Sequence, residues 1–522
     1  MSVEKRLQNY TREALKKLRR GIEKESLRVR PDGELATTPH PAALGSPLTH
    51  PSITTDFSES QLELITGAHA SAGDVSGVDA CLGELTRIHQ FVYRVLGHKA
   101  EDEVLWASSM PCHLPPDDQI PIGRYGSSNI GRMKTVYRMG LSHRYGRRMQ
   151  AISGIHYNFS APGASTEDYF ALIRNFRRQS WLALYLFGAS PAVCTTFVDG
   201  RPHELKELRA GTVYLPHATS LRMGRLGYQS DAQASLCVSY NSLEKYTASL
   251  DEALTRPYPA YERIGIRDGD EYRQLSTSLL QIENEFYSTI RPKRRIRSGE
   301  RPLHALRERG VEYVEVRLMD LDPFEPVGIN AQTMRLLDVL LLHCLLSESP
   351  PDTSEEIRDI GRNQHLVAAR GREPGLKLHR RGAQVALADW GKEILSECRP
   401  IARALDEAHG GAAHADALAH ALALIGDPSL TPSARVLQAM ARNHDNVYVR
   451  FGLVQSLLHA GHLRGLPLAD ETVQAFEATA AKSLAEQKRI EAADTLDFET
   501  YRRKYLSHDT LIIGEPRYRA DR

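Results

Sequence analysis

Acidic side chains and a histidine recur in four short segments whose alternate positions are apolar. In segment 21–29, Glu23 and Glu25 lie two residues apart, so a β-strand would project both carboxylates from one face. The other three segments, 53–66, 151–160 and 311–318, carry Asp56, Glu63, His156 and Glu315, the last sharing its parity with Arg317. The recurrence predicts a set of polar strand faces, each backed by an apolar face.

If these faces meet, five carboxylates and one imidazole share a pocket, and mutual repulsion raises their pKa values unless cations lie among them. Oxygen-rich ligand sets favour Mg²⁺, or Mn²⁺, over zinc. An arginine beside a ligand carboxylate, as at Arg317, suits a polyphosphate bridged to such ions. The pattern therefore favours phosphoryl transfer from a metal–nucleotide complex. The alternative is that each carboxylate is hydrated on an exposed strand face, the commoner arrangement for any single residue.

Strands with one polar and one apolar face build an antiparallel sheet that covers a core on one side and lines a site on the other. Helical periodicity accompanies these strands at residues 75–96 and 166–187, and short strands return over 275–321. Long helical stretches follow at 394–409, 412–425 and 469–489. We therefore predict an α+β fold, with a catalytic part over residues 1–330 and a mainly helical part over 331–522 packed on the sheet as one integrated unit.

The charge balance argues against a polyanionic partner, because 66 Lys and Arg residues face 65 Asp and Glu residues and leave a formal charge of +1. With 41% hydrophobic residues among 522, the composition is that of an ordinary globular protein. Six cysteines without a CxxC pair fit a reducing compartment and predict neither a zinc ribbon nor a disulfide scaffold. The sequence has no apolar signal segment and no run of about 18 apolar residues, so we predict a cytoplasmic protein without a membrane span.

Eight segments resemble the proteobacterial type of glutamate–cysteine ligase, in order and at similar spacing from about residue 10 to the end of the sequence. They are GIEKESLRV (21–29), ITTDFSESQLELIT (53–66), YGSSNIGRMKTVYRMGL (125–141), ISGIHYNFS (152–160), LFGASPAVC (186–194), ATSLRMGRLGY (218–228), QIENEFYSTIRPKR (281–294) and VEYVEVRLMDLDPF (311–324). Eight ordered blocks are far more specific than a single short motif.

The resemblance implies a fold related to glutamine synthetase, in which a curved antiparallel sheet holds ATP and metal ions. The family joins the γ-carboxylate of L-glutamate to the amine of L-cysteine, with ATP cleaved to ADP and phosphate, as the first step of glutathione synthesis. A carboxylate is a poor acyl donor because its leaving group would be oxide, so we expect a γ-glutamyl phosphate to form first. Metal ions and Arg317 would neutralise the transferring phosphoryl group, and no protein nucleophile is needed.

Position by position, the resemblance implies three sets of site residues. The metal-binding set is Glu23, Glu25, Asp56, Glu63, His156 and Glu315. Arg317 is expected to contact the transferring phosphate of ATP, and Arg222 to hold the substrate or intermediate. The substrate contacts are Phe57, Tyr137, Arg138, Leu141, Tyr228 and Tyr287 for the cysteine pocket, and Gln150 and Ile152 for glutamate.

Three motifs imitate other binding sites. Segment 126–131 resembles a phosphate-binding P-loop, but Arg132 stands where that motif needs Lys, and no strand-like run precedes it. The basic run 291–297 has few aromatic neighbours in a neutral chain, which favours a solvated loop or a contact to ATP phosphates over nucleic acid. Three histidines without i,i+3 or i,i+4 pairing fit an alanine-rich helix better than a metal site: His409, His414 and His420.

Two other functions stay open from the sequence. One is a related carboxylate–amine ligase that pairs glutamate with another amine, and the other is a non-catalytic relative that keeps the fold as a binding module. Ligating residues at all six metal positions argue against the second, and the tyrosines of the cysteine pocket favour cysteine. We expect Mg²⁺ or Mn²⁺ as cofactor, ATP and the two amino acids as small-molecule partners, and a monomer that binds neither nucleic acid nor membrane. The helical part beyond residue 330 is expected to buttress the sheet.

Overall fold

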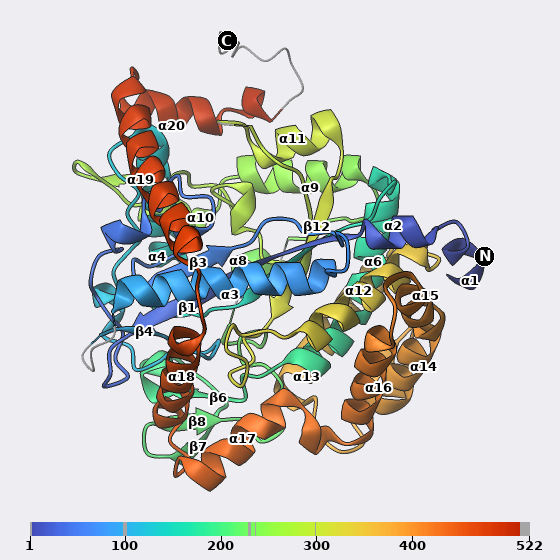
Figure 1. Ribbon diagram of the computed structural model, residues 1–522. Helices are drawn as coiled ribbons and strands as arrows, with labels where there is room; N and C mark the ends of the chain where they lie inside the picture. Colours follow the sequence, from blue (N-terminus) through green and yellow to red (C-terminus); the bar gives the residue numbers. More distant parts are fainter. Residues whose placement is uncertain (1–2, 98–101, 228–230, 235, 298, 512–522) are drawn as a thin grey trace.

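A seven-stranded antiparallel sheet forms the centre of the molecule, in a computed structural model that describes residues 3–97, 102–227, 231–234, 236–297 and 299–511 (Figure 1). The strands run in the order β11–β12–β5–β1–β3–β2, with β4 paired to the end of β1. Their bounds are β1 (Arg19–Val29), β2 (Ile53–Thr55), β3 (Gln61–Ile65), β4 (Val104–Leu105), β5 (Ile155–Ser160), β11 (Ile290–Lys293) and β12 (Tyr313–Met319). The predicted α+β fold with a central antiparallel sheet is confirmed.

The register of this sheet brings the four acidic segments side by side. Glu23 on β1 lies directly opposite His156 on β5, and Glu25 lies opposite Glu63 on β3. Glu315 on β12 lies opposite Asn158, two residues beyond His156 on β5. Opposite residues in antiparallel strands project from the same face of a sheet, so the predicted polar faces become one continuous surface.

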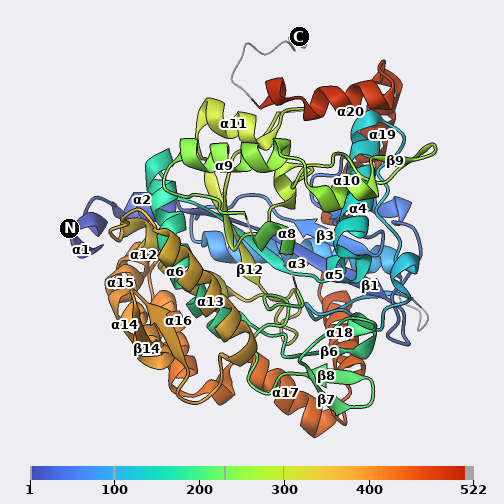
Figure 2. The ribbon, with the colours of Figure 1, turned by 180° about the vertical axis from the view of Figure 1, so that it is seen from behind.

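Three long helices cover the other face of the sheet, namely α3 (Gly77–Leu96), α6 (Thr166–Phe187) and α12 (Ala331–Leu346). α3 packs on β1 and β3, α6 packs on β11 and β12, and α12 packs against both helices (Figures 1 and 2). Arg20 of β1 forms a buried ion pair of 2.9 Å with Asp338 of α12, and the hydroxyl of Tyr157 on β5 donates to the same carboxylate at 2.8 Å. These bonds satisfy the buried charges that hold α12 against the sheet.

Helix ends follow local sequence signals, with one predicted helix divided in two. α6 begins after Ser165, whose side chain forms a capping box with Asp168, and it has the predicted bounds. The predicted helix 394–409 is instead α14 (Leu387–Glu397) followed by α15 (Arg399–His409). Pro400 explains the break, because a proline inside a continuous helix would remove one hydrogen bond and clash with the preceding turn.

The region between β11 and β12 differs from the sequence prediction of short strands alone. It contains α11 (Pro302–Arg309), whose proline at the first helical position is a common helix start. The two other predicted C-terminal helices lie within a residue or a few of their expected bounds, as α16 (Ala413–Gly426) and α19 (Asp470–Ala493). Other α-helices are α1 (Val3–Leu7), α2 (Arg12–Lys16), α5 (Arg147–Gln150), α7 (Thr195–Val198), α8 (Asp231–Ala234), α9 (Leu243–Thr255), α10 (Pro259–Ile264), α17 (Pro432–Asn443) and α18 (Tyr448–Gly465).

The polar face of the sheet is covered by a different group of segments. α4 (Asn129–Tyr145) contacts α20 (Phe498–Leu506), and both views show α19 and α20 beside α4 (Figures 1 and 2). α13 (Ser354–Arg370) packs against α6 and reaches the same region. Helices beyond residue 330 therefore pack on both sides of the sheet, while the division of the chain at that residue stays a prediction. The described ranges also contain three small sheets. One joins β6 (Ala192–Cys194), β7 (Lys206–Arg209) and β8 (Thr212–Tyr214), one joins β9 (Arg267–Asp268) and β10 (Glu271–Tyr272), and one joins β13 (Lys377–Arg380) and β14 (Ala383–Ala386).

None of the helices in the described ranges combines the length and the apolar character needed to cross a membrane. All six cysteines carry free thiols, and five of them are buried, with Cys237 as the exposed one.

Candidate active site

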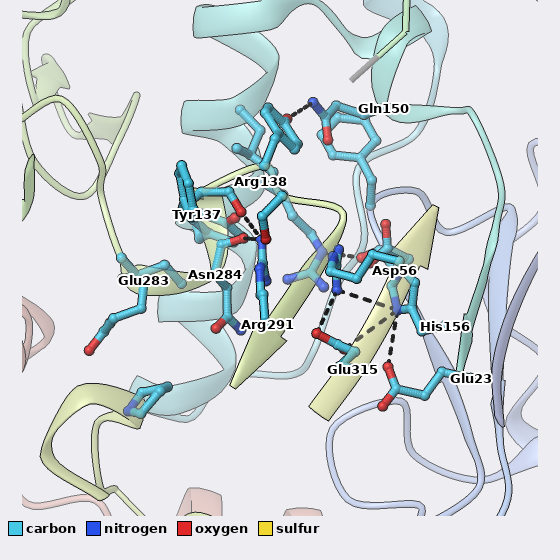
Figure 3. Close-up of a pocket in the computed structure, with 18 of the residues that line it drawn as sticks. Glu23, Asp56, Tyr137, Arg138, Gln150, His156, Glu283, Asn284, Arg291 and Glu315 are labelled. Carbon is cyan, nitrogen blue, oxygen red and sulfur yellow. Dashed lines mark hydrogen bonds and ion pairs between the residues drawn. The ribbon is translucent and has the colours of Figure 1, made fainter. Parts of the chain in front are cut away.

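A cavity of about 720 Å³ opens on the polar face of the central sheet. Its floor consists of side chains from β1, β3, β5 and β12, and its walls include α4 and the segment 282–293 (Figure 3). All six residues of the predicted metal-binding set line it, as do both predicted catalytic arginines: Glu23, Glu25, Asp56, Glu63, His156, Glu315, Arg222 and Arg317. The four polar strand faces therefore meet in one site.

His156 lies at the centre of the acidic cluster. Its Nδ1 is 3.2 Å from Glu23 Oε2 and 3.7 Å from Glu315 Oε1, while its Nε2 is 3.7 Å from Glu25 Oε1. Figure 3 shows Glu23 and Glu315 pointing toward the imidazole ring from neighbouring strands. Burial, reinforced by the charge of Arg317, lowers the pKa of His156, so the ring is neutral and available as a ligand.

Two groups of side chains in the cluster can each hold a cation, and they share His156. One group is Glu23, His156 and Glu315, and the other is Glu25, Glu63 and His156; in each group the ligand atoms lie within 4.8 Å of one another. Carboxylate oxygens dominate both groups, which suits Mg²⁺ or Mn²⁺. Asp56 belongs to neither group but lines the cavity beside them.

The pKa values of this cluster reflect burial and mutual repulsion. Burial, followed by the charge of Asp56, raises the pKa of Glu25 to about 8 and that of Glu63 well above its ordinary value. Glu25 and Glu315 are only 3% and 1% exposed, so the alternative of hydrated carboxylates on an open strand face is wrong for them. A divalent cation would stabilise the ionised carboxylates and displace their protons.

Two cationic side chains compensate Glu315 on the other side of the cluster. Arg317 Nη1 lies 3.1 Å from Glu315 Oε2, and Lys293 Nζ lies 3.3 Å from Oε1 of the same carboxylate. Burial alone would raise the pKa of Glu315, but Lys293 and Arg317 outweigh burial and hold that pKa well below its ordinary value. The floor of the cavity thus carries carboxylates on one side and cations on the other, a distribution that suits a metal-bound polyphosphate.

Arg222 is held in place by a glycine and by the backbone of β12. Its Nη2 donates to the carbonyl of Arg317 at 2.8 Å, and its side chain is almost completely buried. The guanidinium lies against Gly154, where any Cβ would collide with it. Gly154 also donates its backbone N–H to Glu25 Oε2 at 2.8 Å. Close approach of Arg222 to the start of β5 therefore requires glycine at this position.

The structure places most of the predicted amino-acid contacts on the same cavity. Gln150 donates through Nε2 to the hydroxyl of Tyr287 at 2.9 Å, and Arg138 donates to the carbonyl of Asp56. The predicted contacts that line the cavity are Phe57, Tyr137, Arg138, Leu141, Gln150 and Tyr287. Ile152 does not line it: the side chain is fully buried, and the carbonyl accepts from Gln61 Nε2 at 3.0 Å. Tyr228 lies outside the described residues.

Several cavity residues were not predicted as site residues. Lys134 lies one turn before Arg138 on α4, a spacing that could have revealed it, and burial lowers its pKa to about 8. Arg291 and Lys293 alternate on β11; Arg291 is buried, so the solvated-loop interpretation is wrong for the start of the basic run. Segments distant in sequence also contribute lining residues that no local sequence pattern predicts: Gly361, Gln364 and His365 of α13, and Tyr501 and Tyr505 of α20.

Two of the imitative motifs have structural roles. In the P-loop-like segment the backbone N–H of Ser127 donates to Glu491 at 2.8 Å and that of Asn129 donates to Asp494, so carboxylates occupy the positions where a phosphate would bind. His414 pairs with Asp406 at 2.8 Å, and none of the candidate metal groups in the described ranges includes the three predicted histidines.

Comparison with known proteins identifies the family. The glutamate–cysteine ligase family model matches residues 4–167 and 163–367. A glutamate–cysteine ligase of Alcanivorax borkumensis is 48% identical over 515 residues, covering 94% of this chain and 96% of that protein. One of Pseudomonas entomophila is 52% identical over 505 residues, covering 93% of each chain. The chain and these relatives match over nearly their whole lengths.

Solved structures agree with the sequence matches. The crystal structure of a glutamate–cysteine ligase from Francisella tularensis in complex with AMP is 39% identical, with a TM-score of 0.87 over 94% of this chain and 97% of that one. A bifunctional glutathione synthetase from Pasteurella multocida is 26% identical, with a TM-score of 0.69 over 92% of this chain and 58% of that one. Sequence, fold and the acidic cavity lead to one conclusion: the chain belongs to the glutamate–cysteine ligase family.

Proposed function

We propose that this protein joins the γ-carboxylate of L-glutamate to the amine of L-cysteine, with ATP cleaved to ADP and phosphate. The observation that carries the proposal is the meeting of five carboxylates, one histidine and flanking cations in a single cavity. Membership of the glutamate–cysteine ligase family supports the choice of substrates. The same cavity contains polar, aromatic and cationic groups that suit two amino acids and a nucleotide.

The reaction needs two steps, because a carboxylate must be activated before an amine can displace one of its oxygens. A γ-carboxylate oxygen of glutamate first attacks the terminal phosphorus of ATP, which forms γ-glutamyl phosphate and releases ADP. The cysteine amine then attacks the acyl carbon, loses a proton, and expels phosphate. Both steps develop negative charge on phosphate oxygens, so preorganised cations contribute most of the rate enhancement.

The acidic cluster fits Mg²⁺ or Mn²⁺ through its ligand atoms and its charge. We assign the two ligand groups that share His156 to this role, with Asp56 as a neighbouring carboxylate. When bound, the ions would supply charge neutralisation to the triphosphate. Without such a counter-charge, the raised pKa values of Glu25 and Glu63 leave part of the cluster protonated near neutral pH.

The chain's own cations bind and orient the phosphates in this proposal. Arg317 is fixed by Glu315 and reaches the cavity, where it can contact the transferring phosphoryl group. Arg222, buried against Gly154, is suited to the carboxylate or phosphate of the intermediate. Because their positions are set by β12 and by one glycine, neither guanidinium must reorganise during the reaction.

Cysteine would occupy the part of the cavity bounded by α4 and by Tyr287. Tyr137, Arg138 and Leu141 share one side of α4, and the hydrogen-bonded side chains of Gln150 and Tyr287 line the same cavity. Tyrosine rings suit a small thiol side chain, and Arg138 supplies charge for a carboxylate. We propose Gln150 as the glutamate contact, together with the backbone at Ile152.

The direct test measures ADP release by the purified protein with Mg²⁺, ATP, L-glutamate and L-cysteine, and identifies γ-glutamylcysteine by mass spectrometry. We expect ADP release to require both amino acids. Omission of each substrate, and replacement of Mg²⁺ by Mn²⁺ or EDTA, serve as matched controls. ADP release that is independent of cysteine, or absent altogether, would contradict the proposal.

Replacing cysteine separates the proposed reaction from that of a related ligase. 2-Aminobutyrate has the size of cysteine without the thiol, and larger amines test the limits of the pocket. A higher kcat/KM for another amine than for cysteine would identify a different acceptor, and nucleotide binding without any turnover would identify a non-catalytic relative.

We also propose that the protein acts as a cytoplasmic monomer that binds neither nucleic acid nor membrane. Its near-neutral charge and free cysteines support this assignment. Light scattering coupled to size-exclusion chromatography should give the mass of one 58.3 kDa chain, and a mass of two chains would refute the monomer.

A further inference from the structure

Asp320 is a buried carboxylate that lies outside the cavity and next to Arg222. It directly follows β12, its side chain is 0% exposed, and its Oδ1 lies 3.9 Å from Nη1 of Arg222. Arg222 lines the cavity, whereas Asp320 does not. Burial of a charge is costly, and the proposed reaction assigns no task to this carboxylate.

Both oxygens of the Asp320 carboxylate accept hydrogen bonds from other segments of the chain. Oδ2 accepts from the backbone N–H of Ala189 at 2.9 Å and from the hydroxyl of Ser190 at 2.8 Å. Oδ1 accepts from the hydroxyl of Ser220 at 3.0 Å. The carboxylate therefore joins the end of β12 to the segment after α6 and to the segment that carries Arg222.

The segment that carries Arg222 is also held by bonds that do not involve the carboxylate. Leu221 donates its backbone N–H to the carbonyl of Ser190 at 2.7 Å. Met223 donates its backbone N–H to the hydroxyl of Ser220 at 3.3 Å. These bonds fix the path of the backbone on both sides of Arg222, so a change of charge behind the guanidinium can act on the side chain alone.

The buried guanidinium of Arg222 needs a counter-charge. Its Nη2 donates to the carbonyl of Arg317, which carries no net charge. The charge of Glu25 also acts on Arg222, but we assign Glu25 to a metal ion. Burial raises the pKa of Asp320, and the charge of Arg222 is the strongest influence that opposes this rise. Asp320 is therefore suited to compensate Arg222 without competing for a metal ion.

We propose that Asp320 is a positioning residue, whose carboxylate holds the guanidinium of Arg222 in place from outside the cavity. The guanidinium is then fixed by Asp320, by the carbonyl of Arg317 and by close contact with Gly154. The proposal rests on the proposed function, because Arg222 must act on the substrate or the intermediate. It extends the ordered part of the site to a residue that does not line the cavity.

Asp320→Asn tests the proposal, because it keeps the shape of the side chain and one accepting oxygen but removes the charge that faces Arg222. We expect kcat/KM for glutamate to fall by about 10- to 100-fold, while the KM for ATP stays within about threefold of that of the unaltered protein. A purely structural substitution would instead reduce the amount of folded enzyme, measured by circular dichroism, and leave both constants of the folded enzyme unchanged.

A double-mutant cycle with Arg222→Gln shows whether Asp320 acts through Arg222. If it does, kcat/KM for glutamate in the double variant should lie within about threefold of that of Arg222→Gln alone. Fold-changes that multiply would mean that the two residues act independently, and would overturn the proposal. The double variant removes both charges of the buried pair and so leaves neither charge without its partner.

Ser220→Ala gives the same comparison if Asp320→Asn does not fold. It removes one hydroxyl that orients the carboxylate, so we expect kcat/KM for glutamate to fall by about three- to tenfold. This loss should disappear when Arg222→Gln is already present. A loss of the same size in both backgrounds would overturn the proposal.

Asp352→Asn is the matched control. Its carboxylate pairs with Arg177 at 2.9 Å, its side chain is 2% exposed, and it does not line the cavity. The same change of a buried charge should there leave kcat/KM for glutamate unaltered in the folded enzyme. A normal kcat/KM for Asp320→Asn overturns this proposal alone. An unaltered protein that forms no γ-glutamylcysteine overturns the proposed function, and the role of Asp320 with it.

Discussion

Arg317 and Glu315 leave the same face of β12 two residues apart and form an ion pair of 3.1 Å at the floor of the cavity. The carboxylate fixes the guanidinium, and Lys293 together with the guanidinium keeps the pKa of the carboxylate low, so that it stays ionised. The pair thus orders a carboxylate that we assign to a metal ion and a guanidinium that we assign to the transferring phosphate. Each member can be removed by a substitution with a distinct expected outcome.

Arg317→Ala should lower kcat by about 10²- to 10³-fold, the usual cost of removing one preorganised donor from a developing charge. Arg317→Lys should retain part of the rate, because it keeps the charge but loses the planar geometry. Steady-state kinetics with both amino acids saturating will measure the effect. Arg295→Ala, which changes an exposed arginine just after β11, is the control, and an unaltered kcat for Arg317→Ala would contradict the assignment.

Glu315→Gln should remove one bound metal ion and reduce turnover by at least about 10²-fold, because it takes a charged ligand from one of the two ligand groups. Electron paramagnetic resonance of Mn²⁺ titrated into the protein will count the ions. Glu312→Gln changes a carboxylate that does not line the cavity, and both readouts should stay as in the unaltered protein. Full Mn²⁺ occupancy in Glu315→Gln would refute this ligand.

Glu63→Gln should stabilise the metal-free protein while impairing metal binding. Because the pKa of Glu63 is raised in the folded protein, ionisation of this carboxyl group costs stability at every pH above its ordinary pKa. A neutral amide of the same shape avoids that cost. We expect the Tm in EDTA at pH 8 to rise by about 1–4 °C. Differential scanning fluorimetry with Glu312→Gln as control will measure it, and a lower Tm would show that Glu63 is compensated within the protein.

His40 should make the protein acid-sensitive. Burial, followed by the charge of Arg28, lowers its pKa to about 4, so the folded protein favours the neutral ring. The stability that this contributes is complete above pH 6.5 and is lost as the pH falls from 6.5 toward 4. At pH 5 the cost is at most about 2 kcal/mol. Urea unfolding at pH 5 and 7 should therefore show a smaller pH difference for His40→Gln, and an equal difference would refute the effect.

Gly154→Ala should disturb Arg222 without unfolding the protein. The new methyl group would collide with the guanidinium, and a displacement of about 1 Å in a positioning group can cost about 10²-fold in rate. We expect kcat/KM for glutamate to fall by at least about tenfold, with little change in Tm. Gly461→Ala, where nothing lies within 4 Å of the added atom, is the control; a normal kcat/KM would show that Arg222 can move without consequence.

The alternating pattern of single strands was sufficient to predict which residues form the floor of the site. Glu23 and Glu25, or Glu315 and Arg317, must share a face wherever a strand forms. Their meeting depends on the pairing of β1 with β3 and β5, and of β5 with β12, which no local pattern contains. Without the family resemblance, the sequence could therefore supply the ligands but not the cluster.

The walls were less predictable than the floor. Tyr505 reaches the cavity only because α20 packs on α4, more than 350 residues earlier in the chain. A tyrosine on an amphipathic helix is equally compatible with a core position. Ile152 shows that a place in a resembling segment does not put a side chain on the cavity, since its side chain is fully buried and does not line it. Contacts between distant helices are tertiary facts that local periodicity does not encode.

Because His156 lies between them, the two halves of the acidic cluster are coupled in metal binding. One ring nitrogen faces Glu23 and Glu315, and the other faces Glu25. A neutral imidazole carries a single N–H, so committing one nitrogen as an acceptor leaves the proton on the other. Occupation of one half therefore selects the tautomer that disfavours ligation in the other half. A metal ion bound in one half should therefore weaken metal binding in the other half, because the imidazole proton then lies on the nitrogen that faces that other half.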